Sequence, residues 1–351
     1  MTTLPPELWL HVLESLRPSR AVALCPSDPR VRAILSFTLV SRATYTVAVR
    51  CLFQHCLYID SAERLRRLLL TLHAFSSRSE DSTLPHVDLA PCLTNLFLAP
   101  FPPHTIDDLP TAQWTYELLS VMSGTLRRLV IDIPLRSLYP DEDHLNVRPK
   151  LRAAFQQLTA LEEFTSSRDE LYLSVFDLGS PPAEAETLVW AGWSKLKKLA
   201  LYNVALGDPR MAPSLEQLSS LDCLVLTRAD DLDRESFHRT ILPIAAQRDM
   251  KTLIVNVAAD HALNGFSPGR MSSGVSHPVE DTPVTDHKLE LGVVIVEPSK
   301  RHMMNGDILD CQEWIRDTAL AGELWDWESN WSLELTESWN MLPGESDDEV
   351  L

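Results

Sequence analysis

The first 60 residues have an apolar pattern typical of short helices. In Glu7–Leu16, the residues Leu8, Val12, Leu13 and Leu16 recur at spacings that place them on one face of a helix. Two further apolar stretches, 31–35 and 39–53, are also compatible with helices, and prolines separate them from the first. We therefore expect a small helical unit at the start of the chain.

From Leu93 onward the phrase Leu-x-x-Leu-x-Leu recurs, with apolar substitutions. Clear copies begin at Leu93, Leu126, Leu196 and Leu221, and weaker copies begin at Leu161 and Met250. The copies follow one another at intervals of 25 to 35 residues, which is the length of one strand plus one helix. Because Leu-x-Leu places two side chains on one face of a strand, we predict parallel strands joined by helical crossovers. Stacked in order they would form an irregular leucine-rich-repeat-like α/β solenoid, and the alternative is an ordinary α/β domain.

The segments between the copies complete this prediction. Helix-compatible stretches are Gln113–Met122, Leu151–Leu158 and Ser236–Gln247. Polar, proline-containing loops are expected at Ser76–Pro91 and at Ala258–Lys288, the second of them mobile. Leu289–Val296 is then predicted to be the last buried strand, and Asp307–Leu320 a helix.

Composition and charge narrow the class of protein. The chain has 351 residues, of which 45% are hydrophobic and 23% charged, as in globular proteins. Its formal net charge of −18 argues against nucleic-acid binding, which needs a positive surface. No apolar run is long enough to span a membrane, so we expect no membrane partner. The lack of a secretory signal and six cysteines without a CxxC pair favour a cytoplasmic or nuclear protein with reduced thiols.

The C-terminal region combines acidic residues with tryptophans. Residues 307–351 contain 13 acidic residues and one basic residue, together with Trp325, Trp327, Trp331 and Trp339. One interpretation is a cap that packs its indoles over the open end of the solenoid. The other is an exposed acidic-aromatic recognition segment.

The sequence carries no recognisable catalytic motif. It lacks GxSxG, GxxxxGK[ST], GxGxxG and HExxH, so we predict neither an enzyme nor a cofactor. Cys51, His55 and Cys56 lack further zinc ligands at a suitable spacing, which indicates packing instead of a metal site. The acidic clusters at 141–143 and 230–233 precede expected helices, where carboxylates favour the helix dipole. We therefore assign no catalytic, cofactor-binding or metal residues.

The N-terminal sequence resembles the F-box of fungal F-box proteins. The resemblance rests on LPPELWLHVLESL at Leu4–Leu16, LVSR at Leu39–Arg42 and the ending Leu52-Phe53. Residues 17–38 form a longer connection than usual in that family, and Leu52-Phe53 replaces its usual tryptophan. The copies also lack the Asn or Cys of regular leucine-rich repeats, and hold Phe101, Pro134, Val204 and Ala229 there. The implied organisation is an F-box at 1–60, a linker or first cap at 61–92, a repeat region at 93–300 and an acidic cap or tail at 301–351.

This resemblance implies a non-catalytic receptor subunit of an SCF-type (Skp-cullin-F-box) ubiquitin ligase. The F-box would dock on a Skp-type adaptor in a cullin complex, and the repeats would bind an unknown protein substrate. The implied adaptor-binding residues are Leu4, Pro5, Leu8, Val12, Leu39, Val40, Leu52 and Phe53. Two alternatives stay open: these residues could pack on the first repeat, or the chain could be a repeat scaffold with a vestigial F-box.

Overall fold

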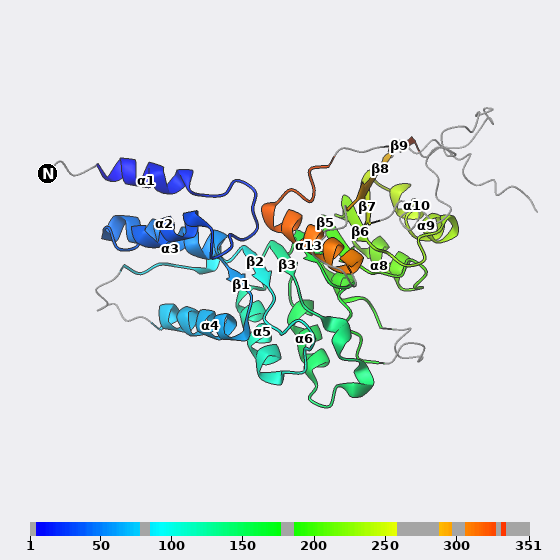
Figure 1. Cartoon of the computed structure of the whole chain (residues 1–351), viewed down its shortest axis with the longest axis horizontal. Coiled ribbons are helices and arrows are strands. Elements are labelled where there is room, and N and C mark those ends of the chain that lie inside the picture. The colour runs from blue at the N-terminus through cyan, green and yellow to red at the C-terminus, as the bar shows by residue number, and fades with distance from the viewer. Residues whose placement is uncertain are drawn as a thin grey trace, which may run out of the picture.

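The computed structural model describes residues 5–77, 85–176, 186–257, 288–296, 306–327 and 331–334, and shows an α/β fold. The sheet keeps the order of the chain from β1 to β9 (Figure 1). Its strands are β1 (Tyr58–Ile59), β2 (Asn95–Leu98), β3 (Arg128–Ile131), β4 (Glu163–Ser166), β5 (Lys198–Tyr202), β6 (Cys223–Thr227), β7 (Met250–Asn256), β8 (Lys288–Ile295) and β9 (Trp331–Glu334). Strands β1 to β8 are parallel, and β9 pairs antiparallel with β8.

The recurring leucines stack across the sheet as the pattern predicts. Leu96 pairs in register with Leu129, and Leu129 with Phe164. The first and fourth positions of every copy are buried, most of them completely. The leucines of the clear copies pack against the crossover elements in the main core. These helices are α4 (Ala62–Ser76), α5 (Leu109–Met122), α6 (Val147–Gln156), α8 (Met211–Gln217), α9 (Arg234–Thr240) and α10 (Leu242–Ala245). Short 3-10 turns are η1 (Ala90–Cys92), η2 (Leu135–Ser137), η3 (Pro140–Glu142) and η4 (Val189–Gly192).

The predicted register of the copy that begins at Met250 is wrong by one residue. Leu224 pairs with Thr252, and Leu226 pairs with Ile254, so Ile254 joins the main core. Leu253 and Val255 instead face the opposite side of the sheet. Because side chains alternate along a strand, a one-residue error exchanges the two faces, and both faces of β7 are apolar.

The helices between the strands begin earlier than their apolar pattern suggests. Helices α5 and α6 each start four residues before the predicted segments 113–122 and 151–158. The Asp108 carboxylate accepts the Thr111 backbone N–H at the start of α5. The Asp143 carboxylate accepts two N–H groups at the start of α6, each at 2.8 Å. The predicted helix 236–247 is divided into α9 and α10, and a proline opens α10.

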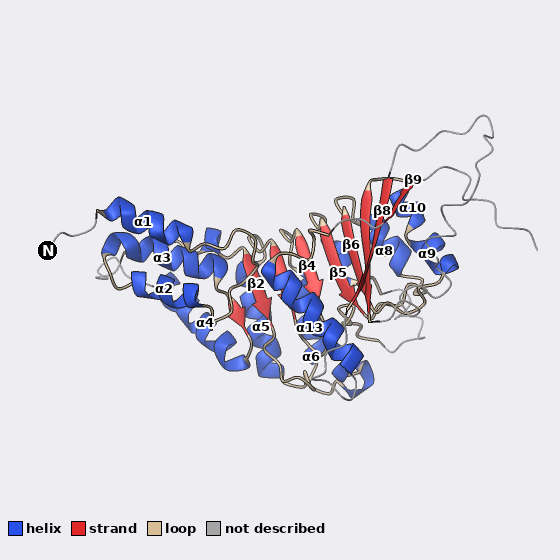
Figure 2. Cartoon of the chain, turned by 45° about the horizontal axis from the view of Figure 1, so that its top comes forward, coloured by secondary structure: helices blue, strands red, loops and turns tan. Residues whose placement is uncertain are grey.

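Three helices at the N-terminus form a unit beyond β1, at one end of the molecule (Figure 2). They are α1 (Pro6–Ser15), α2 (Pro29–Phe37) and α3 (Arg42–His55), close to the predicted helical segments. They share a small core of Leu13, Ile34, Phe37, Ala48 and Cys51. Trp9 contacts Phe37 edge-on, with 5.7 Å between ring centroids.

The structure differs from the prediction in the first 92 residues at three points. The sheet begins at β1, inside the segment predicted as F-box, and the predicted linker 61–92 contains the crossover helix α4. Leu39 and Val40 lie before α3 and outside it, because Ser41 caps this helix through a reciprocal pair of hydrogen bonds with Thr44.

The C-terminal segment lies on the inner face of the sheet, which we define as the face opposite the crossover helices. Helix α13 (Gly306–Ala321) confirms the helix predicted at 307–320, and packs across β3 and β4 (Figure 2). Trp325 and Trp327 pack on the same inner-face cluster. β8 confirms the strand predicted at 289–296, but β9 follows it, so β8 is not the last. The predicted cap of indoles over the open end is therefore wrong for Trp325 and Trp327, which pack on the inner face, whereas β9 extends the sheet beyond β8. Residues 258–287 and Trp339 lie outside the described residues.

A fully buried arginine organises the loops after β3 and β4. The Arg148 guanidinium donates hydrogen bonds to four backbone carbonyls and lies 4.4 Å from the centre of the Tyr172 ring. The accepting carbonyls belong to Leu135, Leu138, Tyr172 and Ser174. Burial lowers the pKa of Arg148, yet these carbonyls and the aromatic face stabilise its charge.

Replacing this arginine should destabilise the protein strongly. In Arg148→Met, four buried carbonyls lose their donor, so we expect the free energy of unfolding to fall by about 3–5 kcal/mol. Urea denaturation followed by circular dichroism measures this loss. Arg32→Met, at an exposed position of α2, is the control and should change stability by less than about 0.5 kcal/mol. Equal effects of the two substitutions would contradict the role of Arg148.

Candidate partner-binding surfaces

An apolar surface is exposed on the N-terminal helices. Five large apolar residues there keep between 42% and 88% of their surface accessible. They are Leu8 and Val12 on α1, Leu35 on α2, and Leu39 and Val40 in the turn before α3. We call these residues the N-terminal apolar surface. Exposed apolar side chains that gather in one small unit are typical of protein interaction sites.

Helix α1 carries more apolar residues than its own core can bury. A proline in its first turn and the apolar spacing favour helix from Pro6 onward. Leu13 is completely buried, and Trp9 and Leu16 pack at the edge of the small core. Leu8 and Val12, one turn apart, remain outside. The apolar face of α1 is thus wider than its contact with α3.

The structure describes seven of the eight predicted adaptor-binding residues, and places them either on the surface or toward the interior. Leu8, Val12, Leu39 and Val40 belong to the N-terminal apolar surface, and Pro5 is exposed at the start of α1. Leu4 lies outside the described residues.

Leu52 and Phe53 point toward the interior of the protein. Leu52 is half-buried against the small helical core, and Phe53 packs on the main core. The ring of Phe53 lies 5.8 Å from that of Phe75 on α4. Sequence reasoning missed Leu35, although its position one turn before Leu39 in an apolar stretch could have indicated it.

The cysteine–histidine group of α3 is a packed site. Burial lowers the pKa of His55 to about 4 and raises the pKa of Cys56 to about 12, so both groups are neutral at pH 7. Among the residues that the structure describes, no group of three His, Cys, Asp or Glu side chains could hold a metal ion. Each acidic cluster lies just before a helix, as predicted, and one carboxylate of each accepts N–H groups there. Asp143 accepts the Val147 N–H of α6, and Asp233 accepts the Ser236 N–H of α9.

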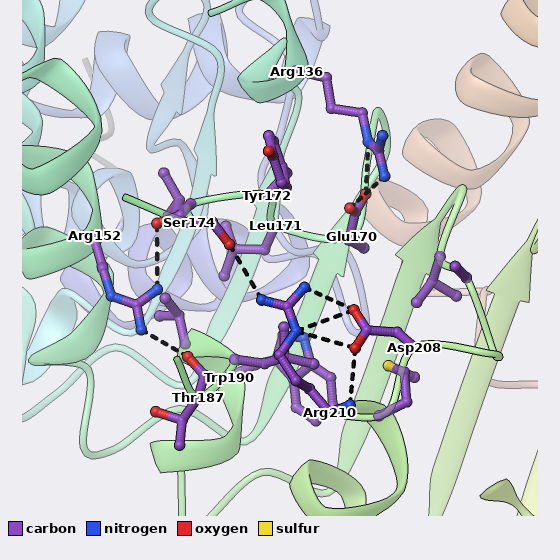
Figure 3. A pocket seen from close by; sticks show the side chains of 16 residues that line it. Arg136, Arg152, Glu170, Leu171, Tyr172, Ser174, Thr187, Trp190, Asp208 and Arg210 are labelled. Carbon is purple, nitrogen blue, oxygen red and sulfur yellow. Dashed lines mark hydrogen bonds and ion pairs between the residues drawn. The ribbon is translucent and has the colours of Figure 1, made fainter. Parts of the chain in front are cut away.

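A small pocket opens between the loop after β4 and the start of α8 (Figure 3). Its volume is about 110 Å³. Three arginines contribute to it, and each has a carboxylate partner of its own. Arg136 pairs with Glu170 at 3.0 Å, Arg152 with Glu186 at 3.1 Å, and Arg210 with Asp208 at 2.7 Å. The pairing neutralises this cluster, so it has no excess positive charge for an anionic ligand.

A larger groove of about 440 Å³ lies at the amino ends of β5 to β8. Trp325 forms one side, and Lys198 and Lys251 are among the other lining residues. Lys198 pairs with Glu163 and Lys251 with Glu290, each at 3.0 Å. Its lysines are therefore also neutralised, and Asp222 and Asp249 in the lining leave the groove with no excess positive charge.

A buried aspartate shapes the loop that borders the small pocket. The Asp169 carboxylate accepts backbone N–H groups from Leu135, Leu171 and Tyr172 at 2.9–3.3 Å. Burial raises its pKa to about 7, because desolvation outweighs these donors. Leu171 adopts a left-handed backbone (φ 63°) next to it, so the aspartate holds a strained turn.

Asp169 should make stability depend on pH. Its pKa is about 7 in the folded protein, whereas the ordinary aspartate value of 3.8 applies to the unfolded chain. Between these values the folded state binds one more proton, so the free energy of unfolding should fall as pH rises from about 4 to 7. Urea denaturation at a series of pH values measures the slope. Asp169→Asn should remove this part of the slope, and an unchanged slope would contradict the assignment.

Comparison with protein-family models, with curated proteins and with solved structures finds no match to this chain. In the described part of the chain, no helix has the length and apolar character needed to cross a membrane. The interpretation of function therefore depends on the residues and surfaces described above.

Proposed function

We propose that this protein is a non-catalytic substrate receptor of an SCF-type ubiquitin ligase, in the cytoplasm or nucleus. The observation that carries the proposal is the N-terminal apolar surface, because four of its five residues come from the segments that resemble an F-box. Leu8 and Val12 come from the LPPELWLHV segment, and Leu39 and Val40 from LVSR. Four of the eight residues chosen by resemblance thus coincide with large apolar residues that the structure places at exposed positions.

The physical argument for docking is the cost of leaving these side chains in water. Burying a Leu or Val side chain contributes about 1.5–3 kcal/mol. A Skp-type adaptor with an apolar groove would remove this area from water, as in other complexes in which a helix docks into a groove. Leu52 and Phe53 would then contribute indirectly, since Leu52 packs within the helical unit and Phe53 holds α3 on the main core.

The remainder of the chain fits the role of a substrate-binding region. Parallel strands in chain order, joined by crossovers on one face, support an irregular leucine-rich-repeat-like solenoid. Such an array offers edges and loops for a protein substrate. The substrate would be presented to a ubiquitin-conjugating enzyme held by the cullin, so the chain itself needs no catalytic group.

Adaptor binding tests this proposal directly. The full chain is co-expressed with a fungal Skp-type adaptor, purified, and its affinity for the adaptor measured by calorimetry. We expect a 1:1 complex. The double substitution Leu8→Asp/Val12→Asp should weaken it by about a hundredfold or more, because two apolar contacts worth about 3 kcal/mol together are lost.

A matched control separates docking from general surface effects. Leu70 on α4 and Val121 on α5 are as exposed as Leu8 and Val12 but lie on crossover helices. Leu70→Asp/Val121→Asp should leave adaptor affinity unchanged. A folded chain that binds no adaptor would overturn the proposal in favour of a repeat scaffold with a vestigial F-box, as would equal losses in the two double variants.

A further inference from the structure

The inner face of the sheet is apolar and depends on the C-terminal segment for its cover. Phe97, Val130, Ala200, Val225 and Leu253 project from five different strands onto this face, and all are buried. The covering residues include Cys311, Ile315, Ala319 and Leu324, which are also buried. We call residues 306–327 the strap.

The strap also contacts the connection between α1 and α2. The Val22 N–H donates to the Leu320 carbonyl at 2.9 Å, and the Arg20 guanidinium pairs with Asp326. Val22 and Ala23 are buried in the same cluster as the strap's apolar residues. Segments about 300 residues apart in sequence are therefore packed as one structure.

The same connection is bonded to the sheet and to α3. Arg128, at the start of β3, donates to the Arg20 carbonyl at 2.7 Å. The Leu24 N–H donates to the His55 carbonyl at the end of α3, also at 2.7 Å. Residues 20–24 are thus a junction at which the α1–α2 connection, the sheet, α3 and the strap meet.

One glycine shows how closely the strap fits this junction. Gly322 has a φ of +78°, and a Cβ at this position would clash with the Arg20 carbonyl. Only glycine combines this backbone conformation with so close an approach. Arg316, in the middle of the strap, lies 3.4 Å from Asp132 after β3, so the strap is also bonded to the sheet away from the junction.

We infer that the strap anchors α1 to the sheet, so that α1 and the sheet move as one rigid body. Helix α1 otherwise packs on α3 through its small core, and the connection after it has no regular secondary structure. The strap holds this connection in a fixed position relative to the sheet. A disturbance of the strap is therefore transmitted to Leu8 and Val12, although it touches neither residue. The inference holds whether or not an adaptor binds there.

Pulsed electron spin resonance on the full chain tests this coupling. Spin labels are placed at Glu14→Cys on α1 and Glu216→Cys on α8, both exposed, in a Cys25→Ser background that removes the exposed native thiol. The unmodified strap should give one narrow distance distribution. Gly322→Ala should broaden and shift it, because the added methyl group pushes the α1–α2 connection off the strap.

Two controls separate coupling from general damage. Gly124→Ala adds the same methyl group where no atom lies within 4 Å, and should leave the distribution narrow. Hydrogen exchange in β5 and β6 should remain slow in Gly322→Ala if the sheet stays folded.

A charge exchange provides a second test that does not alter the backbone. Asp326→Arg should broaden the distribution because it faces Arg20, and the added substitution Arg20→Asp should restore it. An unchanged distribution in Gly322→Ala, or one that is already broad in the parent, would overturn the inference. Loss of exchange protection throughout the sheet without any change at α1 would also overturn it.

Discussion

The register between successive strands is the constraint on which the rest of the structure depends. The carbonyl just before each of the strands β2 to β5 accepts two N–H groups from the start of the next strand. Thr94 accepts from Arg127 and Arg128, and Arg127 accepts from Glu162 and Glu163. This hydrogen-bond ladder aligns equivalent residues across the sheet, so leucines stack on one face. It also aligns Arg127, Glu162 and Lys197, which form a row of alternating charges with ion pairs between neighbours. The ladder of backbone carbonyls at this edge is present although the copies lack the asparagine of regular leucine-rich repeats.

A sheet that is apolar on both faces needs a cover on both. The crossover helices cover one face, and they follow from the repeating unit itself. No element of the repeating unit covers the inner face. In this chain the strap, which lies far along the sequence from most of the strands, covers it. The part of the inner face under α13 is therefore already occupied and is closed to a partner protein. This restricts where a substrate of the proposed ligase could bind.

Local patterns predicted the local structure well. The spacing of Leu93, Leu96 and Leu98 and of its later copies located the strands, because burial on one face imposes a period of two. Helix starts at α5 and α6 were predicted too late, since polar caps at Asp108 and Asp143 set them and the apolar pattern does not. The register predicted for the copy at Met250 was wrong because both faces of β7 are apolar and the pattern cannot distinguish them.

The placement of the strap could not be predicted, since nothing near Ile315 or Gly322 in sequence indicates contact with residues 20–24. For the candidate surface, the resemblance found Leu8, Val12, Leu39 and Val40 but not that Phe53 faces the core.

The distance in sequence between the two sides of the junction determines when the fold can be completed. Arg20 and Asp326 are separated by 306 residues. Synthesis at 5–20 residues per second takes roughly 15–60 s to cover that distance. During this time strands β1 to β8 can pair on the ribosome while their inner face is still open to water. A nascent chain that stops before residue 306 carries an uncovered apolar sheet, which is the kind of surface that aggregates or recruits chaperones. The strap is thus made after the strands that it covers, and the inner face is complete only once residues 306–327 have been added.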